Sequence, residues 1–433
     1  MFDPQDHHKE VLASLGDLDI ASRVSAALED ILSAENLSGP LYILAFGKCA
    51  EIMSKASERI IGTRIVRRLL IVSNLLVNEV LELPGTDIET IESDHPIPTE
   101  RSVAAAIRVI SWVSEIPANG ILVNLISGGG SAMICAPRAG LAFEVKRTIL
   151  KKLLISGVPE REINILRKAM SRVKGGKLLE YFQGNTVVNI YVSDESDDKV
   201  EAISSGPTVP HRQVAPKRIV NRYALHEKLS AAEIHILNDY QPNSGESHIT
   251  AQKLIFNRIV ATRHDLFDKI GDRYRKKGYF VIDSGIHFRT KNVDSVCRRM
   301  IRFAKVKRSC HRGSPLVILF SGEIQVCVPP DSGGQGGRNQ HLVAQLIPLS
   351  LQYDLNFDFI ALATDGIDFL PGVHGAYLPS TSLRTPDTAR MASHYLEHYD
   401  TNALHSKLGT LVTGNKSGYN FSDIFLMFVA ENE

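Results

Sequence analysis

The chain has 433 residues, of which 44% are hydrophobic and 22% are charged. This length suggests two domains, or three, and this composition excludes a disordered chain. Lys and Arg (49) nearly balance Asp and Glu (48), so no net charge favours nucleic acid or an anionic membrane as a partner.

Cysteine usage and the start of the sequence predict a cytoplasmic protein. The five cysteines are scattered and show no paired metal-binding spacing, which is typical of a reducing compartment. The first ten residues contain no apolar core, so we expect no signal peptide. No segment approaches twenty uninterrupted apolar residues, so we expect no membrane span.

The first predicted strand covers residues 41–46 and follows a helical pattern over 17–32. It ends at Gly47 and Lys48, where a helix over 49–61 begins. Open α/β sheets bind ligands at the carboxyl ends of their strands, so Lys48 is a candidate active-site cation. The alternative is a solvated lysine at a helix start.

Two further strands are predicted over 69–73 and 88–92, followed by an extended loop at His95. Thr99 is expected to cap a helix that continues through Trp112. His95 is interpreted as a structural loop histidine, with a ligand contact as the alternative.

Residues 122–131 form the most informative stretch, LVNLISGGGS. The apolar run lacks sustained alternation, as expected for a strand buried on both faces. Glycines remove every Cβ from the turn, so backbone N–H groups can approach a phosphate or carboxylate. The candidate phosphate-binding residues are Ser127, Gly128, Gly129, Gly130 and Ser131; the alternative is a plain glycine-rich loop.

Helices are predicted over 141–155 and 159–170, and a strand over 186–192. That strand ends in the acidic segment SDESDD, which includes Asp194 and Asp198. Carboxylates beside a phosphate site suit Mg²⁺, which prefers oxygen ligands. A solvated acidic turn is the alternative.

The pattern weakens between 213 and 246, and we place the domain boundary there, giving domains 1–235 and 236–433. Strands are expected over 254–261, 279–283, 316–320, 359–363 and 424–429. Glu323 and Asp365 each follow one of these strands. A glycine cluster leads into Arg338 at the start of a helix that Pro348 should end, which is a second anion site in outline.

The alternation of strands and helices predicts two doubly wound, Rossmann-like α/β domains with an active-site cleft between them. Several common motifs are missing. The sequence has no P-loop, because Asn415 interrupts the nearest candidate, and no G-x-G-x-x-G fingerprint after a strand. Kinase signatures and the G-x-S-x-G elbow are also missing.

A set of short motifs occurs in a characteristic order: FGKCAEIM, HPIPTE, SGGGSAM, SRVKGGKL, SDESDD, SSGPT, SGE, GGRNQ and TDGID. Together they resemble the glycerate 2-kinase family, whose C-terminal part is called the MOFRL domain. The resemblance implies transfer of a phosphoryl group from ATP to the 2-hydroxyl of D-glycerate with Mg²⁺, in a cleft between two α/β domains.

The resemblance also assigns roles. Lys48 and Arg338 match the catalytic lysine and arginine, residues 127–131 match the phosphate-binding loop, and Lys174 is a nucleotide-binding candidate. Three segments, 286–289, 369–374 and 414–420, depart from the family pattern, and Asp197 stands where glycine is usual.

From these matches we expect Asp194 and Asp198 to hold Mg²⁺, with Asp194 also catalytic. Glu323 or Asp365 would accept the substrate proton, and the choice between them stays open. As partners we expect D-glycerate and ATP, with a homodimer left open. Two alternatives remain: a hydroxypyruvate reductase, and a noncatalytic phosphometabolite-binding protein.

Overall fold

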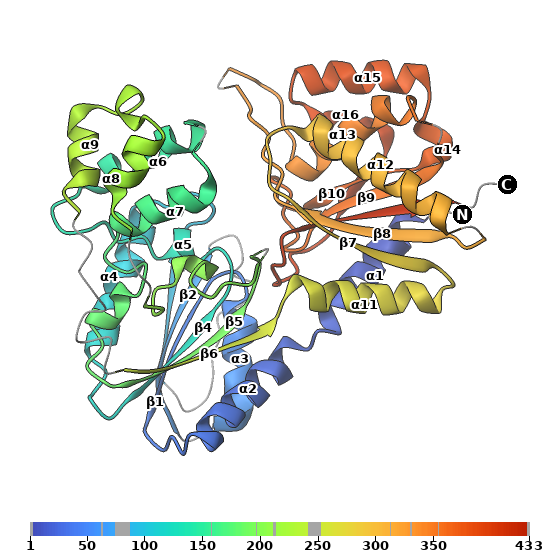
Figure 1. Ribbon diagram of the computed structural model, residues 1–433. Helices are drawn as coiled ribbons and strands as arrows, with labels where there is room; N and C mark the ends of the chain where they lie inside the picture. The colour runs from blue at the N-terminus through green and yellow to red at the C-terminus, as the bar shows by residue number, and fades with distance from the viewer. Residues whose placement is uncertain are drawn as a thin grey trace. The chain divides into compact units, whose positions relative to one another are not determined.

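The computed structural model describes residues 3–61, 64–73, 87–156, 158–195, 197–210, 214–240, 253–311, 313–329, 331–353 and 355–430. The chain divides into two compact units. We call residues 20–261 the N-terminal unit, and residues 1–19 together with 262–433 the C-terminal unit. Each unit is an α/β structure, as the sequence predicts, and each is described separately here (Figure 1).

The N-terminal unit contains a six-stranded sheet in the order β3-β2-β1-β4-β5-β6, and every neighbouring pair is parallel. This is the strand order of doubly wound dinucleotide-binding folds. The strands are β1 (Leu41–Phe46), β2 (Ile65–Ser73), β3 (Asp87–Ser93), β4 (Ile121–Ile126), β5 (Thr186–Val192) and β6 (Leu254–Ala261).

The central strands β1, β4 and β5 are buried along their whole length. The polar Asn124 is tolerated in β4 because it lies beside Asn189, which in turn lies beside Asn257 in β6. The amide of Asn124 donates to Asn189 over 2.8 Å, and the amide of Asn189 donates to Asn257 over 2.9 Å. This ladder fixes the register of three parallel strands, because a slipped strand would leave buried amides without partners.

Helices pack on both faces of this sheet. Helices α2 and α3 pack against its strands, and α4 packs against β2 and β3. Four of the helices, α6 to α9, surround a small apolar core of their own (Figure 1). The helices are α2 (Ile20–Ala34), α3 (Ala50–Ile61), α4 (Glu100–Ser114), α5 (Gly130–Met133), α6 (Phe143–Ile155), α7 (Glu160–Ala169), α8 (Pro216–Arg222) and α9 (Ala231–Asn238), with the short 3-10 turns η2 (Lys177–Glu180), η3 (Ile203–Ser205) and η4 (Leu225–Glu227).

The sheet of the C-terminal unit has the order β11-β10-β9-β12-β8-β7. Only β7 and β8 are parallel among its neighbouring pairs, because β12 runs antiparallel between β8 and β9. The doubly wound parallel order therefore applies to the first sheet, and the second is mixed. The strands are β7 (Phe280–Phe288), β8 (Leu316–Gly322), β9 (Phe357–Ala363), β10 (Val373–Leu378), β11 (Leu411–Thr413) and β12 (Asp423–Val429).

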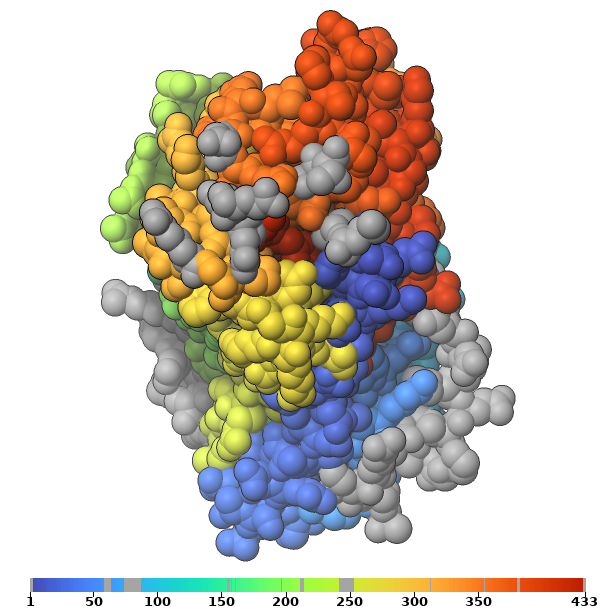
Figure 2. Space-filling view, turned by 90° about the vertical axis from the view of Figure 1, so that its right-hand side faces the viewer, coloured from blue at the N-terminus to red at the C-terminus, as the bar shows by residue number. Residues whose placement is uncertain are grey.

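The first helix of the chain belongs to this C-terminal unit. Helix α1 packs beside α11, and Figure 2 shows the two side by side at the surface. His7 of α1 reaches the hydroxyl of Tyr274 in α11 over 2.7 Å. The helices are α1 (Pro4–Gly16), α11 (Arg263–Lys276), α12 (Val293–Cys310), α13 (Arg338–Ser350), α14 (Ser380–Leu383), α15 (Pro386–Glu397) and α16 (Thr401–Leu408).

The observed division differs from the boundary predicted at residues 235 and 236. That position falls inside helix α9, and β6 lies beyond it as the sixth strand of the first sheet. The weak apolar pattern of residues 213–246 led to the early boundary, although α8 and α9 occupy part of it. Pro348 also does not end its helix at once, because α13 continues to Ser350. No described helix has both the length and the apolar character needed to cross a bilayer.

Candidate active site

Lys48 and the glycine-rich turn lie side by side at the carboxyl edge of the first sheet. Lys48 follows β1 and the turn follows β4, and these two strands are neighbours. The chain winds outward from β1 to one side and from β4 to the other, so this is the topological switch point at which such sheets bind ligands. The sequence prediction of two adjacent site elements is consistent with this geometry.

Three hydrogen bonds join the two turns. The Lys48 N–H donates to the Gly128 carbonyl over 2.9 Å, and the Cys49 N–H donates to the Ser127 hydroxyl over 2.9 Å. The Ser127 N–H donates to the Phe46 carbonyl over 3.2 Å. Because these bonds involve the backbone, the position of Lys48 is set by the fold rather than by its side chain.

Gly47 is required for this approach. Its φ of +108° lies in the region that side chains rarely adopt, and a Cβ there would lie 2.4 Å from the Ser127 hydroxyl oxygen. Glycine is therefore structurally required at position 47, and Lys48 directly after it is the candidate cation.

The far side of the glycine turn is held by two serines that the sequence analysis quoted only as part of a motif. The Ser204 hydroxyl donates to the Ser127 carbonyl over 2.7 Å, and the hydroxyls of Ser131 and Ser205 lie 2.6 Å apart. A Cβ on Gly130 would lie 2.5 Å from the Ser204 hydroxyl oxygen. The turn thus has room for backbone only, which is what a close backbone approach to an anion needs.

Lys174 lies behind the turn and is 2% exposed. Its ammonium donates to the Ser131 carbonyl, so it contacts the last residue of the turn through that residue's backbone. Burial, with a smaller contribution from nearby cations and against the effect of Cys135, lowers the pKa of Lys174 to about 7. The predicted nucleotide-binding lysine is therefore placed as a support for the turn.

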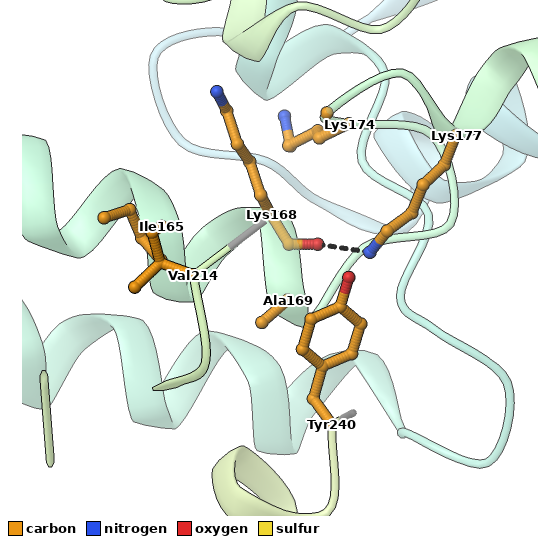
Figure 3. Close-up of a pocket in the computed structure, with 8 residues that line it drawn as sticks. Ile165, Lys168, Ala169, Lys174, Lys177, Val214 and Tyr240 are labelled. Carbon is orange, nitrogen blue, oxygen red and sulfur yellow. Dashed lines mark hydrogen bonds between the residues drawn. The ribbon is translucent and has the colours of Figure 1, made fainter. Parts of the chain in front are cut away.

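Lys168 and Lys177 share a small pocket with Lys174 and Tyr240, which Figure 3 shows. Lys168 donates to the Glu201 carbonyl over 2.8 Å, and Lys177 donates to the Lys168 carbonyl over 2.6 Å. Burial lowers the pKa of both lysines to about 8. These amines satisfy the backbone carbonyls of Glu201 and Lys168 and give the pocket beside Lys174 a positive charge.

The acidic segment predicted to hold Mg²⁺ follows β5. Asp194 is half-buried, and Asp198 has a buried Oδ1 with no hydrogen-bond partner among the described residues. Asp197 instead pairs with Lys199 over 2.8 Å. Across the described parts of the chain, no group of three or more Asp, Glu, His or Cys side chains is arranged to hold a metal. The metal role of Asp194 and Asp198 stays a prediction.

A second set of predicted residues meets in the C-terminal unit, around Arg338 at the start of α13. Its guanidinium donates to Asp423 over 2.9 Å and is also the ion-pair partner of that carboxylate. Burial disfavours the charged guanidinium, but Asp423, Glu323 and Asp365 outweigh burial and raise its pKa. The Arg338 side chain keeps 39% of its surface exposed, so it can still meet a ligand.

Asp423 is a site residue that the sequence analysis missed. It is the first residue of β12 and lies opposite Gly322 in β8 and Ala363 in β9. Glu323 follows Gly322 directly, and Asp365 is two residues after Ala363. Burial raises the pKa of Asp423 to about 7 even though Arg338 lowers it. The sequence signal that could have identified Asp423 is an aspartate followed directly by the apolar run of residues 424–429.

The helix start at Arg338 does not offer the anion site that the sequence outlined. The N–H groups of Asn339 and Gln340 each donate to the carboxylate of Asp368 over 3.0 Å. Asp368 therefore caps the helix from within the chain, and its negative charge occupies the position that the helix dipole favours. The Arg338 side chain, rather than the helix start, is therefore the candidate for contact with an anion at this position.

The predicted site residues thus form two sets, one in each unit. Lys48, the glycine turn and Lys174 belong to the N-terminal set, with Asp194 and Asp198 at the end of the next strand. The C-terminal set consists of Arg338, Glu323 and Asp365, to which the structure adds Asp423. The cleft expected between the units stays a prediction.

Two known family profiles match this chain, one in its N-terminal part and one in its C-terminal part. The profile of a domain of unknown function, DUF4147, matches residues 8–238, and the MOFRL family profile matches residues 316–423. The first profile alone covers more than half of the chain.

A protein named glycerate kinase from Bos taurus is 34% identical to this chain, covering 90% of it and 84% of the relative. The chain belongs to the glycerate 2-kinase family. A relative from Pyrococcus horikoshii, named glycerate 2-kinase, is 29% identical over 91% of the chain and 88% of its own length. One from Agrobacterium vitis, named putative hydroxypyruvate reductase, is 30% identical over 79% of the chain and 88% of its length.

A solved structure supports the same fold for members of this family. The crystal structure of a glycerate kinase from Thermotoga maritima superposes with a TM-score of 0.74 at 23% identity, covering 99% of this chain and all of that one. At this identity the likeness concerns the fold. It confirms the two-domain α/β architecture predicted from the sequence.

Proposed function

We propose that this chain is a glycerate kinase that transfers a phosphoryl group from ATP to the 2-hydroxyl of D-glycerate, giving 2-phospho-D-glycerate and ADP. One observation carries the proposal: a lysine and a glycine-rich turn meet at the β1–β4 switch point of a doubly wound sheet. The family relatives named glycerate kinase support the substrate.

The glycine turn suits the phosphates of a nucleotide. Its glycines have no Cβ that would keep an anion away from their backbone N–H groups, and Gly130 is packed so closely that it has no room for a side chain. Lys48 brings a positive charge to the same edge of the sheet. Phosphoryl transfer requires mainly alignment and neutralisation of charge, and these residues supply both.

The acidic segment after β5 fits a hard cation in its donor chemistry. The buried Oδ1 of Asp198 has no partner among the described residues, and carboxylate oxygen is a ligand that Mg²⁺ accepts. When bound, Mg²⁺ neutralises charge on the nucleotide phosphates. In this proposal Asp194 and Asp198 hold the ion, directly or through water.

The C-terminal set is proposed to act on the acceptor. The planar guanidinium of Arg338 is suited to bidentate contact with a carboxylate or a phosphoryl group. Glu323 or Asp365 would orient the 2-hydroxyl and accept its proton. Asp365 accepts a hydrogen bond from the Ile367 N–H over 3.0 Å, whereas Glu323 lies 3.6 Å from Arg289.

The deciding experiment incubates the full chain with ATP, Mg²⁺ and D-glycerate and identifies the product by ³¹P NMR. We expect ADP and 2-phosphoglycerate in equal amounts, and no product without Mg²⁺. Formation of 3-phosphoglycerate would overturn the regiochemistry, and no phosphoglycerate at all would overturn the proposal. L-Glycerate serves as the matched control substrate.

A hydroxypyruvate reductase is the second candidate. The strand order is that of dinucleotide-binding folds, and one relative carries this name. However, the β1 turn reads Phe46-Gly47-Lys48-Cys49 and lacks the G-x-G-x-x-G pattern. Consumption of NADH with hydroxypyruvate in the absence of ATP would favour the reductase. Tight ATP binding without turnover would favour a noncatalytic phosphometabolite-binding protein.

Two further expectations accompany this proposal. We expect the enzyme to work in the cytoplasm, and none of its five cysteines, all within the described ranges, forms a disulfide. A homodimer is tested by light scattering of the purified chain.

A further inference from the structure

The carboxyl ends of β7 and β8 carry a hydrogen-bonded series of three polar side chains. His287 in β7 lies directly opposite Ser321 in β8. The Ser321 hydroxyl accepts a hydrogen bond from the Arg263 guanidinium over 2.6 Å and lies 3.0 Å from Nδ1 of His287. These three residues have no part in the mechanism proposed above for Arg338 and Glu323.

The direction of this series follows from the chemistry of its members. Arginine can only donate, so Ser321 must accept from Arg263 and has one hydrogen left to give. Ser321 is completely buried, and among the residues that the structure describes the other hydrogen-bond neighbour of its hydroxyl is Nδ1 of His287. Nδ1 is then the acceptor and the ring hydrogen sits on Nε2, because the opposite arrangement would leave a buried hydroxyl hydrogen without an acceptor.

The ring of His287 is consequently neutral, and its single N–H group is at Nε2. The pKa of His287 is lowered to about 4, mainly by burial. The charges of Arg289, Arg263 and Arg338 also act to lower this pKa, and the charge of Glu323 acts to raise it. Nε2 is buried and has no hydrogen-bond partner among the residues that the structure describes. An unsatisfied buried donor destabilises the folded chain, so such a group calls for a partner from outside the chain.

The surroundings of this donor indicate the kind of partner. Arg289 and Arg338 are cations that act electrostatically on His287 and are partly exposed, with side chains 32% and 39% exposed. A donor N–H beside two arginines suits an anionic oxygen. Glu323, the alternative acceptor in this cluster, is contacted by Arg289 and by the Ser422 hydroxyl.

We propose that the Nε2–H of His287, together with Arg289, forms an oxyanion subsite that receives a carboxylate oxygen of the hydroxy acid substrate. Arg263 and Ser321 act as positioning residues, because they fix the ring hydrogen on Nε2 without touching the ligand. This subsite deepens the proposed function and rests on it. The competing occupant of the Nε2–H is a single ordered water.

The first test reads the histidine directly by NMR of the full chain labelled with ¹⁵N-histidine, with His287→Gln used for assignment. We expect a neutral ring protonated on Nε2, and a shift of its Nε2–H signal when D-glycerate is added without ATP. A ring protonated on Nδ1, or an Nε2–H signal unchanged by saturating D-glycerate, would overturn the proposal and would leave water as the occupant.

The second test measures affinity. Loss of a hydrogen bond to a charged oxygen should weaken D-glycerate binding by about 10- to 100-fold in His287→Ala, while the KM for ATP changes less than about 2-fold. His287→Gln, which can present an amide N–H, should recover part of the loss and also covers the case in which the alanine variant fails to fold. Glycerol, which lacks the carboxylate, should bind both variants and the parent chain equally weakly.

The matched control is His394→Gln on the exposed face of α15, which should leave affinity unchanged. Equal D-glycerate affinity in the parent chain and both His287 variants would refute the subsite while the kinase proposal stands. If the parent chain neither binds nor phosphorylates D-glycerate, the proposed function itself fails, so the two failures are distinguishable.

Discussion

The backbone N–H of Lys48 donates to the carbonyl of Gly128 over 2.9 Å, which joins the turn after β1 to the turn after β4. The candidate cation and the candidate phosphate cradle are therefore held together through their backbones. A lysine held in this way brings its charge to the turn without needing a side-chain contact to set its position.

Replacement of Lys48 by methionine should abolish most of the activity and preserve the fold. The backbone bond to Gly128 does not depend on the side chain, so the turn should stay in place while the charge is lost. We expect kcat to fall by about 100-fold or more, with unchanged circular dichroism and thermal stability. Lys55→Met on the exposed face of α3 is the matched control. Near-normal turnover in Lys48→Met would remove Lys48 from the mechanism.

Replacement of Gly130 by alanine should weaken nucleotide binding. The new Cβ would lie 2.5 Å from the Ser204 hydroxyl oxygen and 2.6 Å from the Phe46 ring, so the turn or its neighbours must move. We expect the KM for ATP to rise by about 10-fold or more and unfolding to become easier by about 1–3 kcal/mol. Gly16→Ala is the control, because nothing lies within 4 Å of its added Cβ. If both variants match the parent chain, close packing of the turn is unimportant.

The N-terminal half of the site could be predicted from local pattern. The strands that end at Gly47 and Ser127 are buried apolar runs followed by glycines, and in parallel sheets such ends meet at one edge. The sequence could not show that Ser204 and Ser205 hold the turn, since they lie more than seventy residues further along the chain.

The C-terminal half was harder to predict. Alternation of strands and helices suggested a second doubly wound domain, but the direction of β12 depends on where the chain returns, which periodicity does not encode. For the same reason the pairing of Arg338 with Asp423 was missed. The capping of α13 by Asp368 also depends on a contact across 29 residues, so the helix start was interpreted as an open anion site.

Arg338 and Asp423 should behave as a coupled pair. Arg338→Met should remove activity by about 100-fold or more and should also destabilise the chain, because it leaves the Asp423 carboxylate buried without its cation. Adding Asp423→Asn should restore much of the stability, measured by urea unfolding, without restoring turnover. A double variant no more stable than Arg338→Met would show that the pair is not the source of the destabilisation.

Lys174 should make stability rise with pH, which is opposite to the effect of a lysine whose pKa is raised by a salt bridge. Below about pH 7 the lysine is protonated in both the folded and the unfolded chain, so folding carries the full cost of burying a charge. Between pH 7 and 10.5 the folded chain has released this proton while the unfolded chain still binds it, so stability rises with pH.

Lys174→Gln removes the titrating group and keeps an N–H donor for the Ser131 carbonyl. Urea unfolding at pH 7, 8 and 9 should therefore show that the free energy of unfolding rises less with pH in the variant than in the parent chain. The two slopes should differ by up to about 1.4 kcal/mol per pH unit. Lys168 and Lys177 are present in both chains, so the difference in slope reports the removal of Lys174. Lys151→Gln, an exposed lysine of α6, should leave the slope of the parent chain unchanged. Equal slopes for Lys174→Gln and the parent chain would mean that Lys174 does not lose its proton on folding in this range.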